Sequence, residues 1–151
     1  LFLFKLTGWL IFQCYSSIFN VFSVFSIYKR QGYYVMQNNK INYVELPASK
    51  LDKTKVFFNR VFGWTFVDYG PEYSAFEHAG LDGGFFKSEK SSLTHNGSAL
   101  VVLYSDNLNV IKDTIIEHGG VIVQDIFVFP GGKRFHFLDP SNNEFAVWSD
   151  R

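Results

Sequence analysis

The sequence predicts an α+β fold in which two βαβββ modules pair their curved sheets around a shared cavity. A weak repeat at an offset of 57 residues begins at Lys40, and the order of one strand, one helix and three short strands occurs in both copies. The chain of 151 residues is 47% hydrophobic, which is enough for a packed interior. A four-stranded sheet with one helix covers only one of its faces, so the other face of each sheet needs the sister sheet.

The repeat depends on five identities that fall at corresponding places in the two copies. They are Val44 and Val101, Leu46 and Leu103, Leu51 and Leu108, Lys55 and Lys112, and Gly63 and Gly120. We therefore expect the first module at about residues 40–87 and the second at about residues 98–150, joined by a polar linker at residues 87–98.

Each copy begins with a strand, at residues 40–46 and 99–104, and continues with a helix. Ser49 is the expected cap of the first helix, and Ser105 or Asp106 that of the second. The inward side chains are Leu51, Thr54, Phe58, Val61 and Phe62 in the first helix, and Leu108, Ile111, Ile115 and Ile116 in the second. Left-handed caps are expected to end the helices at Gly63 and at Gly119 and Gly120.

Six further short apolar runs predict the remaining strands. They lie at residues 64–69, 73–79, 81–86, 121–129, 133–138 and 144–148. Glycine, proline, asparagine and aspartate separate these runs, and residues 139–143 in particular have the composition of a turn.

Composition excludes several classes of protein. Fourteen basic and fourteen acidic side chains give a net charge of zero, which is not the electrostatic footprint of a nucleic-acid-binding protein. The single cysteine, Cys14, excludes a scaffold of intrachain disulfides and a cysteine-rich zinc site. We expect a cytoplasmic protein.

Residues 1–35 differ in composition from the rest of the chain. They contain no acidic residue and hold eleven of the 29 aromatic residues, and a stretch without charge runs from Leu6 to Tyr28. The stretch is long enough for a tilted membrane span, with Lys29 and Arg30 on the cytoplasmic side. A signal peptide is the weakest alternative because a small-residue cleavage site is missing. The interpretation that we favour is that this segment is not part of the native domain, which would begin at Met36.

Three stretches of the chain resemble a known family. They are NYVELPASKLDKTKVFFNRVFGW, GLDGGFF and FPGGKRFHFLDPSNNEFAVW, and the likeness spans residues 39–150. They resemble the vicinal oxygen chelate superfamily, which includes glyoxalase I, bleomycin and fosfomycin resistance proteins and extradiol dioxygenases. The resemblance implies a glyoxalase-like domain at residues 36–151, with its ligand site in the cavity between the modules.

The resemblance also indicates where metal ligands stand in metal-using members. The matching positions are Tyr43, Leu100 and Ala146, and a fourth within residues 81–86, where Gly83 and Gly84 carry no side chain. Leucine, alanine and glycine offer no side-chain donor, and a phenol is a poor ligand unless it is ionised. We therefore expect no metal and no other cofactor, and chemistry that needs the family metal is not expected.

Strand alternation places several polar side chains on the cavity face. Glu45 shares a face with Tyr43, and if His136 pairs opposite Ala146, Arg134 and Trp148 also point into the cavity. A shift of one residue would place Phe135 and Phe137 there instead. His136 near Glu45 would form a proton-transfer pair. The alternatives are that Glu45 is a solvated edge residue and that His136 makes a structural hydrogen bond.

The predicted function is the binding of a small, partly aromatic molecule between the sheets. The predicted ligand-binding residues are Tyr43, Gly83, Gly84, Phe86, Tyr104, Arg134 and Trp148. The alternative is a lyase or isomerase of the glyoxalase type, in which Glu45 and His136 are catalytic and move a proton. The expected partner is the small molecule, without nucleic acid. The linker is long enough for a homodimer in which modules are exchanged, and a membrane is expected only if residues 1–35 belong to the protein.

Overall fold

The structure is a computed structural model that describes residues 37–151. The three interpretations of residues 1–35 lie outside the described residues. Within them, no helix is both long enough and apolar enough to cross a membrane. The cytoplasmic location stays a prediction.

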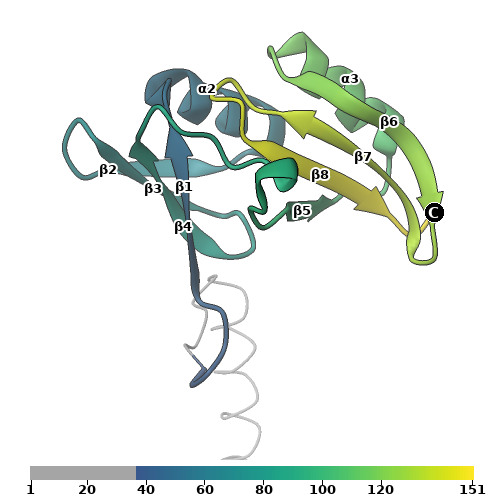
Figure 1. Cartoon of the computed structure of the whole chain (residues 1–151), viewed down its shortest axis with the longest axis horizontal. Helices are drawn as coiled ribbons and strands as arrows, with labels where there is room; N and C mark the ends of the chain where they lie inside the picture. The colour runs from purple at the N-terminus through teal and green to yellow at the C-terminus, as the bar shows by residue number, and fades with distance from the viewer. Residues whose placement is uncertain (1–36) are drawn as a thin grey trace, which may run out of the picture. The chain divides into compact units, whose positions relative to one another are not determined.

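The first module is a mixed four-stranded sheet with one helix (Figure 1). Its strands are β1 (Tyr43–Ala48), β2 (Thr65–Asp68), β3 (Tyr73–Glu77) and β4 (Asp82–Lys87), and its helix is α2 (Leu51–Phe62). The strand order is β1-β4-β3-β2, with β1 parallel to β4 and the other pairs antiparallel. We call it sheet A.

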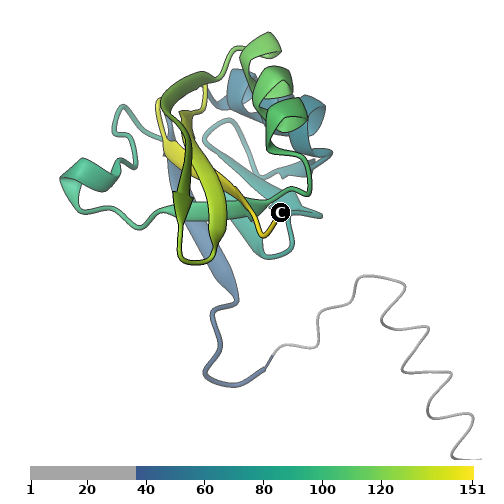
Figure 2. The ribbon, with the colours of Figure 1, turned by 90° about the vertical axis from the view of Figure 1, so that its right-hand side faces the viewer.

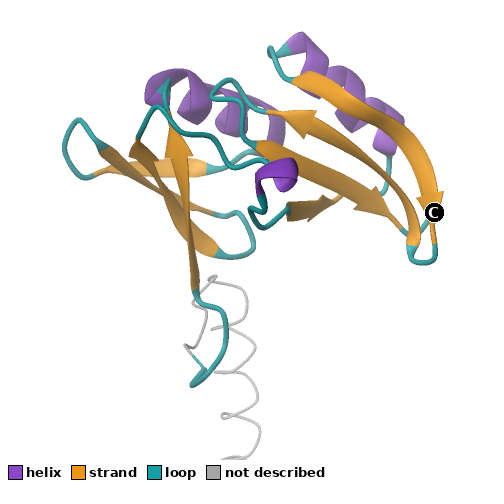
Figure 3. Cartoon of the chain, in the orientation of Figure 1, coloured by secondary structure: helices purple, strands orange, loops and turns teal. Residues whose placement is uncertain are grey.

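The second module repeats this topology, so the predicted fold is confirmed (Figure 3). Its elements are β5 (Val101–Tyr104), α3 (Leu108–Glu117), β6 (Val121–Phe129), β7 (Gly132–Leu138) and β8 (Glu144–Ser149). They form sheet B in the order β5-β8-β7-β6, again with one parallel pair, β5 and β8. The linker contains a short 3₁₀ helix, η1 (Thr94–Asn96).

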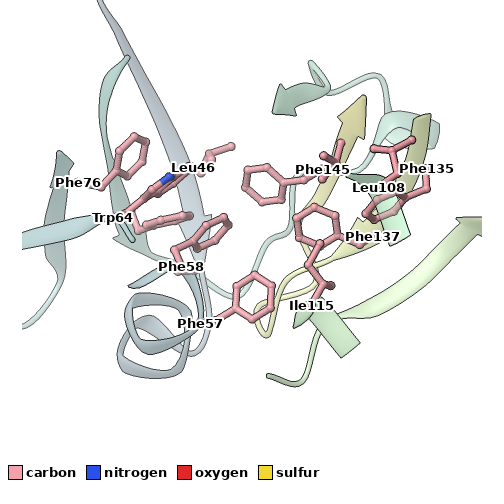
Figure 4. Packing of buried hydrophobic residues seen from close by; sticks show 13 residues of the cluster. Leu46, Phe57, Phe58, Trp64, Phe76, Leu108, Ile115, Phe135, Phe137 and Phe145 are labelled. Atoms are coloured by element: carbon pink, nitrogen blue, oxygen red, sulfur yellow. The ribbon is translucent and has the colours of Figure 1, made fainter. Parts of the chain in front are cut away.

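One hydrophobic core joins the two modules (Figure 4). It lies on the side of the sheets where both helices pack (Figure 2). The ring of Phe58, on α2, lies 5.3 Å from Phe85 of sheet A and 5.0 Å from Phe145 of sheet B, measured between centroids. Phe137 of sheet B packs against Phe57 of α2 at 6.0 Å. Full burial of one such side chain contributes about 1.5–3 kcal/mol. Because Phe58 is buried between the two sheets, α2 helps to hold them together.

The expected helix caps are only partly confirmed. Gly63 ends α2 in the left-handed conformation, with φ of 72°, as predicted. The residue before α2 is Lys50 rather than Ser49, and it makes no side-chain cap. The cap of α3 is Asn107, whose side chain accepts a hydrogen bond from the Val110 N–H, rather than Ser105 or Asp106.

The start of α2 is capped instead by the turn between β7 and β8. The Ser141 hydroxyl accepts the Lys50 N–H at 3.0 Å and lies 2.8 Å from the Thr54 hydroxyl. In the same turn, Asn143 donates to the Pro47 carbonyl at 2.7 Å. The turn therefore fixes the second module to the first, a role that its turn composition did not indicate.

The predicted hairpin register is confirmed. His136 pairs opposite Ala146 and Arg134 opposite Trp148 in the β7–β8 ladder. Phe135 and Phe137 are fully buried on the helix side, so the alternation of β7 places Arg134 and His136 on the opposite side, which we call the helix-free face. The shifted register would have buried the arginine against a helix.

Candidate functional site

The helix-free face of sheet B holds a chain of three hydrogen-bonded side chains. His136 Nδ1 lies 2.8 Å from Glu144 Oε1. The other carboxylate oxygen, Oε2, accepts the Thr94 N–H at 2.8 Å and the Thr94 hydroxyl at 2.6 Å. Thr94 belongs to η1, so the linker between the modules orients a carboxylate, which in turn orients the imidazole.

This arrangement keeps Glu144 ionised. Burial by itself raises the pKa of the Glu144 carboxyl, but the hydrogen bonds from His136 and Thr94 outweigh it and lower the pKa to about 2. An ionised carboxylate only accepts hydrogen bonds, so Nδ1 of His136 carries the proton that lies between them. In the neutral imidazole, Nε2 is then a hydrogen-bond acceptor.

That acceptor has no partner in the protein. His136 is 7% exposed, and its Nε2 is fully buried without a hydrogen bond. Buried polar atoms are nearly always hydrogen-bonded, and exceptions are frequent at functional sites. The orientation of the ring together with the free Nε2 makes His136 the best candidate for a group that meets a ligand.

Aromatic rings and one arginine surround His136. The Phe127 ring lies 5.8 Å from the imidazole, and the guanidinium carbon of Arg134 lies 5.1 Å from the rings of both Phe127 and Phe129. Trp148, opposite Arg134, is 5.3 Å from Tyr104. The predicted residues Arg134, His136, Trp148 and Tyr104 therefore lie on two neighbouring strand pairs of sheet B.

Glu45 is not the carboxylate that contacts His136, which corrects the predicted pair. Glu45 lies on the edge strand of sheet A, is exposed, and accepts a hydrogen bond from the Tyr73 hydroxyl at 3.0 Å. The Tyr73 hydroxyl is 2.7 Å from that of Tyr43, and burial together with these neighbours raises the pKa of Tyr73. The catalytic role assigned to Glu45 stays a prediction, without contact to His136.

The two glycines of β4 accommodate the protein's own rings, and their ligand-binding role stays a prediction. A Cβ atom on Gly84 would meet the Tyr73 side chain within 2.1 Å, and one on Gly83 would meet the Phe76 ring within 2.2 Å on the core side. Gly84 thus lies under Tyr73. Phe86, paired with Tyr73, is 37% exposed at the end of the same face.

The side chains at the family's metal positions do not fit a divalent cation. Leu100 and Ala146 have no donor atom, and Gly84 has no side chain. The hydroxyl of Tyr43 is engaged with Tyr73. Among residues 37–151, no group of three or more His, Cys, Asp or Glu side chains could hold a metal ion.

A pocket of about 550 Å³ lies between the first strands of the two modules. Leu46 of β1 and residues 101–104 of β5 line it, together with Trp64 and Phe76 from the core. Tyr104 belongs both to this lining and to the aromatic group around Trp148. Most of its lining belongs to the core on the helix side, and His136, Arg134 and Trp148 do not line it.

Residues 40–147 match the family model described as Glyoxalase/Bleomycin resistance protein/Dioxygenase superfamily. The chain belongs to this superfamily. The match spans both modules, in agreement with the repeat and with the topology of the two sheets. No match was found among curated protein sequences.

Solved structures of this superfamily share the fold. A family enzyme from Burkholderia phytofirmans PsJN is 16% identical, covers 74% of this chain and 99% of its own, and has a TM-score of 0.62. The genomically encoded fosfomycin resistance protein of Listeria monocytogenes is 15% identical over 75% and 94% of the chains, with a TM-score of 0.62. Lactoylglutathione lyase from Agrobacterium tumefaciens is 20% identical over 76% and 96%, with a TM-score of 0.56. At these identities the likeness shows the fold of this superfamily member and not its ligand.

Two residues of the site were not found from the sequence. Glu144 is two positions before Ala146 on the same face of β8, which makes it a diagonal neighbour of His136, within reach of its ring. The predicted register was therefore a sufficient signal for it. Thr94 lies in the linker, where no periodic pattern indicates its neighbours.

Proposed function

We propose that this superfamily member binds a small, partly aromatic molecule between its two sheets, without the metal of other members. The observation that carries the proposal is the buried Nε2 of His136, an acceptor without a partner. Its orientation is fixed through Glu144 and Thr94, so no rearrangement of these groups is needed before a donor binds.

The surroundings of His136 support an aromatic ligand. Phe127, Phe129, Trp148 and Tyr104 present rings on the same face, and aromatic pairs contribute about 0.5–1.5 kcal/mol each beyond the area that they bury.

A thermal-shift screen with small aromatic metabolites and antibiotics tests the proposal. We expect at least one compound to raise the Tm, and Trp148→Ala and Tyr104→Ala to remove that rise. Tyr69→Ala, an exposed tyrosine beyond β2, is the matched control that should keep it. A panel that raises the Tm nowhere, or a rise unaffected by both variants, contradicts binding at this site.

The absence of a metal requirement is tested separately. We expect elemental analysis of the purified protein to find no stoichiometric transition metal, because the side chains at the ligand positions lack donors. A bound transition metal in a one-to-one ratio would refute this part of the proposal while leaving the aromatic site open to test.

A second candidate function is a lyase or isomerase. The hydrogen-bonded order Thr94, Glu144, His136 supports it, because a carboxylate that orients an imidazole is the arrangement of a general base. The base is assigned to His136 with Glu144 as its positioning partner, in place of Glu45. A relative of similar fold is a lactoylglutathione lyase, which agrees with the same reaction class.

Turnover separates this candidate from simple binding. An enzyme of this kind shows a rate that depends on pH and is lost in His136→Asn. Asp113→Asn, an exposed control, should keep that rate. If mass spectrometry finds every bound ligand chemically unchanged, the protein is a binding protein only.

We also propose that the protein forms a homodimer. β1 and β5 are edge strands, and Tyr43, Val102 and Tyr104 on them are 42–52% exposed. Edges of this kind are usually covered, and a second copy of the chain would cover both. Light scattering coupled to gel filtration should give twice the mass of one chain, and Val102→Lys should reduce it; a monomer at all concentrations contradicts the proposal.

A further inference from the structure

Arg134 is held in one orientation but lacks an acidic partner. Its guanidinium carbon lies 5.1 Å from the centroids of the Phe127 and Phe129 rings, so two aromatic faces fix it by cation–π contacts. The ion pairs recorded among residues 37–151 involve other cations. Its Nε is fully buried without a hydrogen-bond acceptor.

The carboxylate on the same face is not a partner for Arg134. Glu144 receives its hydrogen bonds from His136 and Thr94, with both oxygens engaged. Glu144 is therefore used elsewhere, while a planar fork of N–H donors on Arg134 stays available. Such a fork matches the two oxygens of a carboxylate.

From this geometry we propose that the ligand of the site carries an anionic group, a carboxylate on an aromatic ring, and that Arg134 selects it. The inference depends on the proposed binding function and names its substrate class. The carboxylate takes the donors of Arg134, and the aromatic ring packs on Trp148, which stands opposite Arg134 and lies 6.5 Å from Phe129. Phe127 lies beside both Arg134 and His136, so the two unpaired nitrogen atoms, Nε and Nε2, belong to one cluster of side chains.

Benzoate and benzamide are suitable probes because they have the same size and differ in charge. Isothermal titration calorimetry of the full chain should show that benzoate binds at least ten times more tightly than benzamide. Arg134→Gln should remove the preference, and Arg134→Lys, which keeps the charge but loses the planar fork, should retain only part of it. Lys133→Gln, an exposed cation next to it on β7, is the matched control and should leave the preference unchanged.

The outcomes separate the inference from the function on which it depends. Equal binding of the two probes to the wild-type chain, or a benzoate preference that survives in folded Arg134→Gln, overturns the anionic class and leaves aromatic binding intact. Binding of neither probe, with no other aromatic compound raising the Tm, removes the proposed function itself. Circular dichroism of each variant shows that the fold is retained.

Discussion

At the scale of single residues, Glu144 joins stability to the organisation of the site. Its pKa is about 2 in the folded chain against an ordinary value of 4.5, so the ionised form is favoured by folding. The stability that this carboxylate contributes is complete above about pH 4.5 and is lost as the pH falls toward about 2.

Glu144→Gln is therefore expected to destabilise the protein by about 1–3 kcal/mol at pH 7, because charged hydrogen bonds are replaced by neutral ones. The difference from wild type should shrink as the pH is lowered from about 4.5 to about 2. Urea denaturation at pH 7, 5, 4 and 3 measures it. Glu89→Gln, an exposed linker residue, serves as control, and a difference independent of pH would argue against stabilisation by hydrogen bonds to the ionised carboxylate.

Gly84 illustrates a residue whose requirement is visible only in three dimensions. A Cβ atom there would meet Tyr73 within 2.1 Å, so Gly84→Ala must displace that ring and the hydroxyl that reaches Glu45. We expect a loss of about 1–3 kcal/mol. Because the conflict involves one side chain, the loss should be largely absent in the background Tyr73→Ala, as a double-mutant cycle measures. Additive effects would place the cause in the backbone.

At the scale of elements, the turn between β7 and β8 has a larger role than its composition indicates. Asn143 is fully buried, donates to the Pro47 carbonyl and to Asp139, and accepts the Ser92 N–H at 2.8 Å. Asn143→Ala leaves these buried groups unsatisfied, with an expected cost of about 3 kcal/mol.

The neighbouring Asn142 is the matched control for this experiment. It is exposed and has a φ of 63°, which glycine adopts without strain, so Asn142→Gly should change stability by less than about 0.5 kcal/mol. Chemical denaturation of both variants measures their free energies of unfolding. Similar losses in the two would mean that the turn matters through its backbone conformation and not through the bonds of Asn143.

The elements themselves were predictable because each follows from local signals. Alternation and turn residues predicted both modules, and the register of β7 followed from the cost of burying Arg134 against a helix. Contacts between segments distant in sequence were not predictable in this way. The hydrogen bond from Thr94 to Glu144 and the cap that Ser141 gives α2 depend on how the linker and the modules meet. Strand alternation indicates the face on which Glu45 lies but not its partner, so it could not show that Glu45 bonds to Tyr73 and not to His136.

At the scale of the whole molecule, the shared core predicts that the two modules unfold together. Phe58 contacts Phe85 of sheet A and Phe145 of sheet B, and the same cluster includes Trp64 and Phe137. Separation of the sheets would uncover part of the helix-side face of each, because Phe57 and Phe58 of α2 pack against sheet B while α3 covers the rest of it. Separation of the modules would expose this whole cluster, so a state with one folded module is expected to be unpopulated.

Two tryptophans report on the modules separately. Trp64 is buried beside Phe58 in the first module, and Trp148 lies on the helix-free face of the second. In chains that keep one of them, with Trp9 and the other replaced by phenylalanine, we expect the fluorescence transition in urea to coincide with the transition in far-UV circular dichroism in both cases. Phe58→Leu should shift both probes together by about 1–1.5 kcal/mol. If the Trp148 transition precedes loss of secondary structure, or if Phe58→Leu moves the Trp64 midpoint alone, sheet B is stable without α2 and the core is two cores in contact.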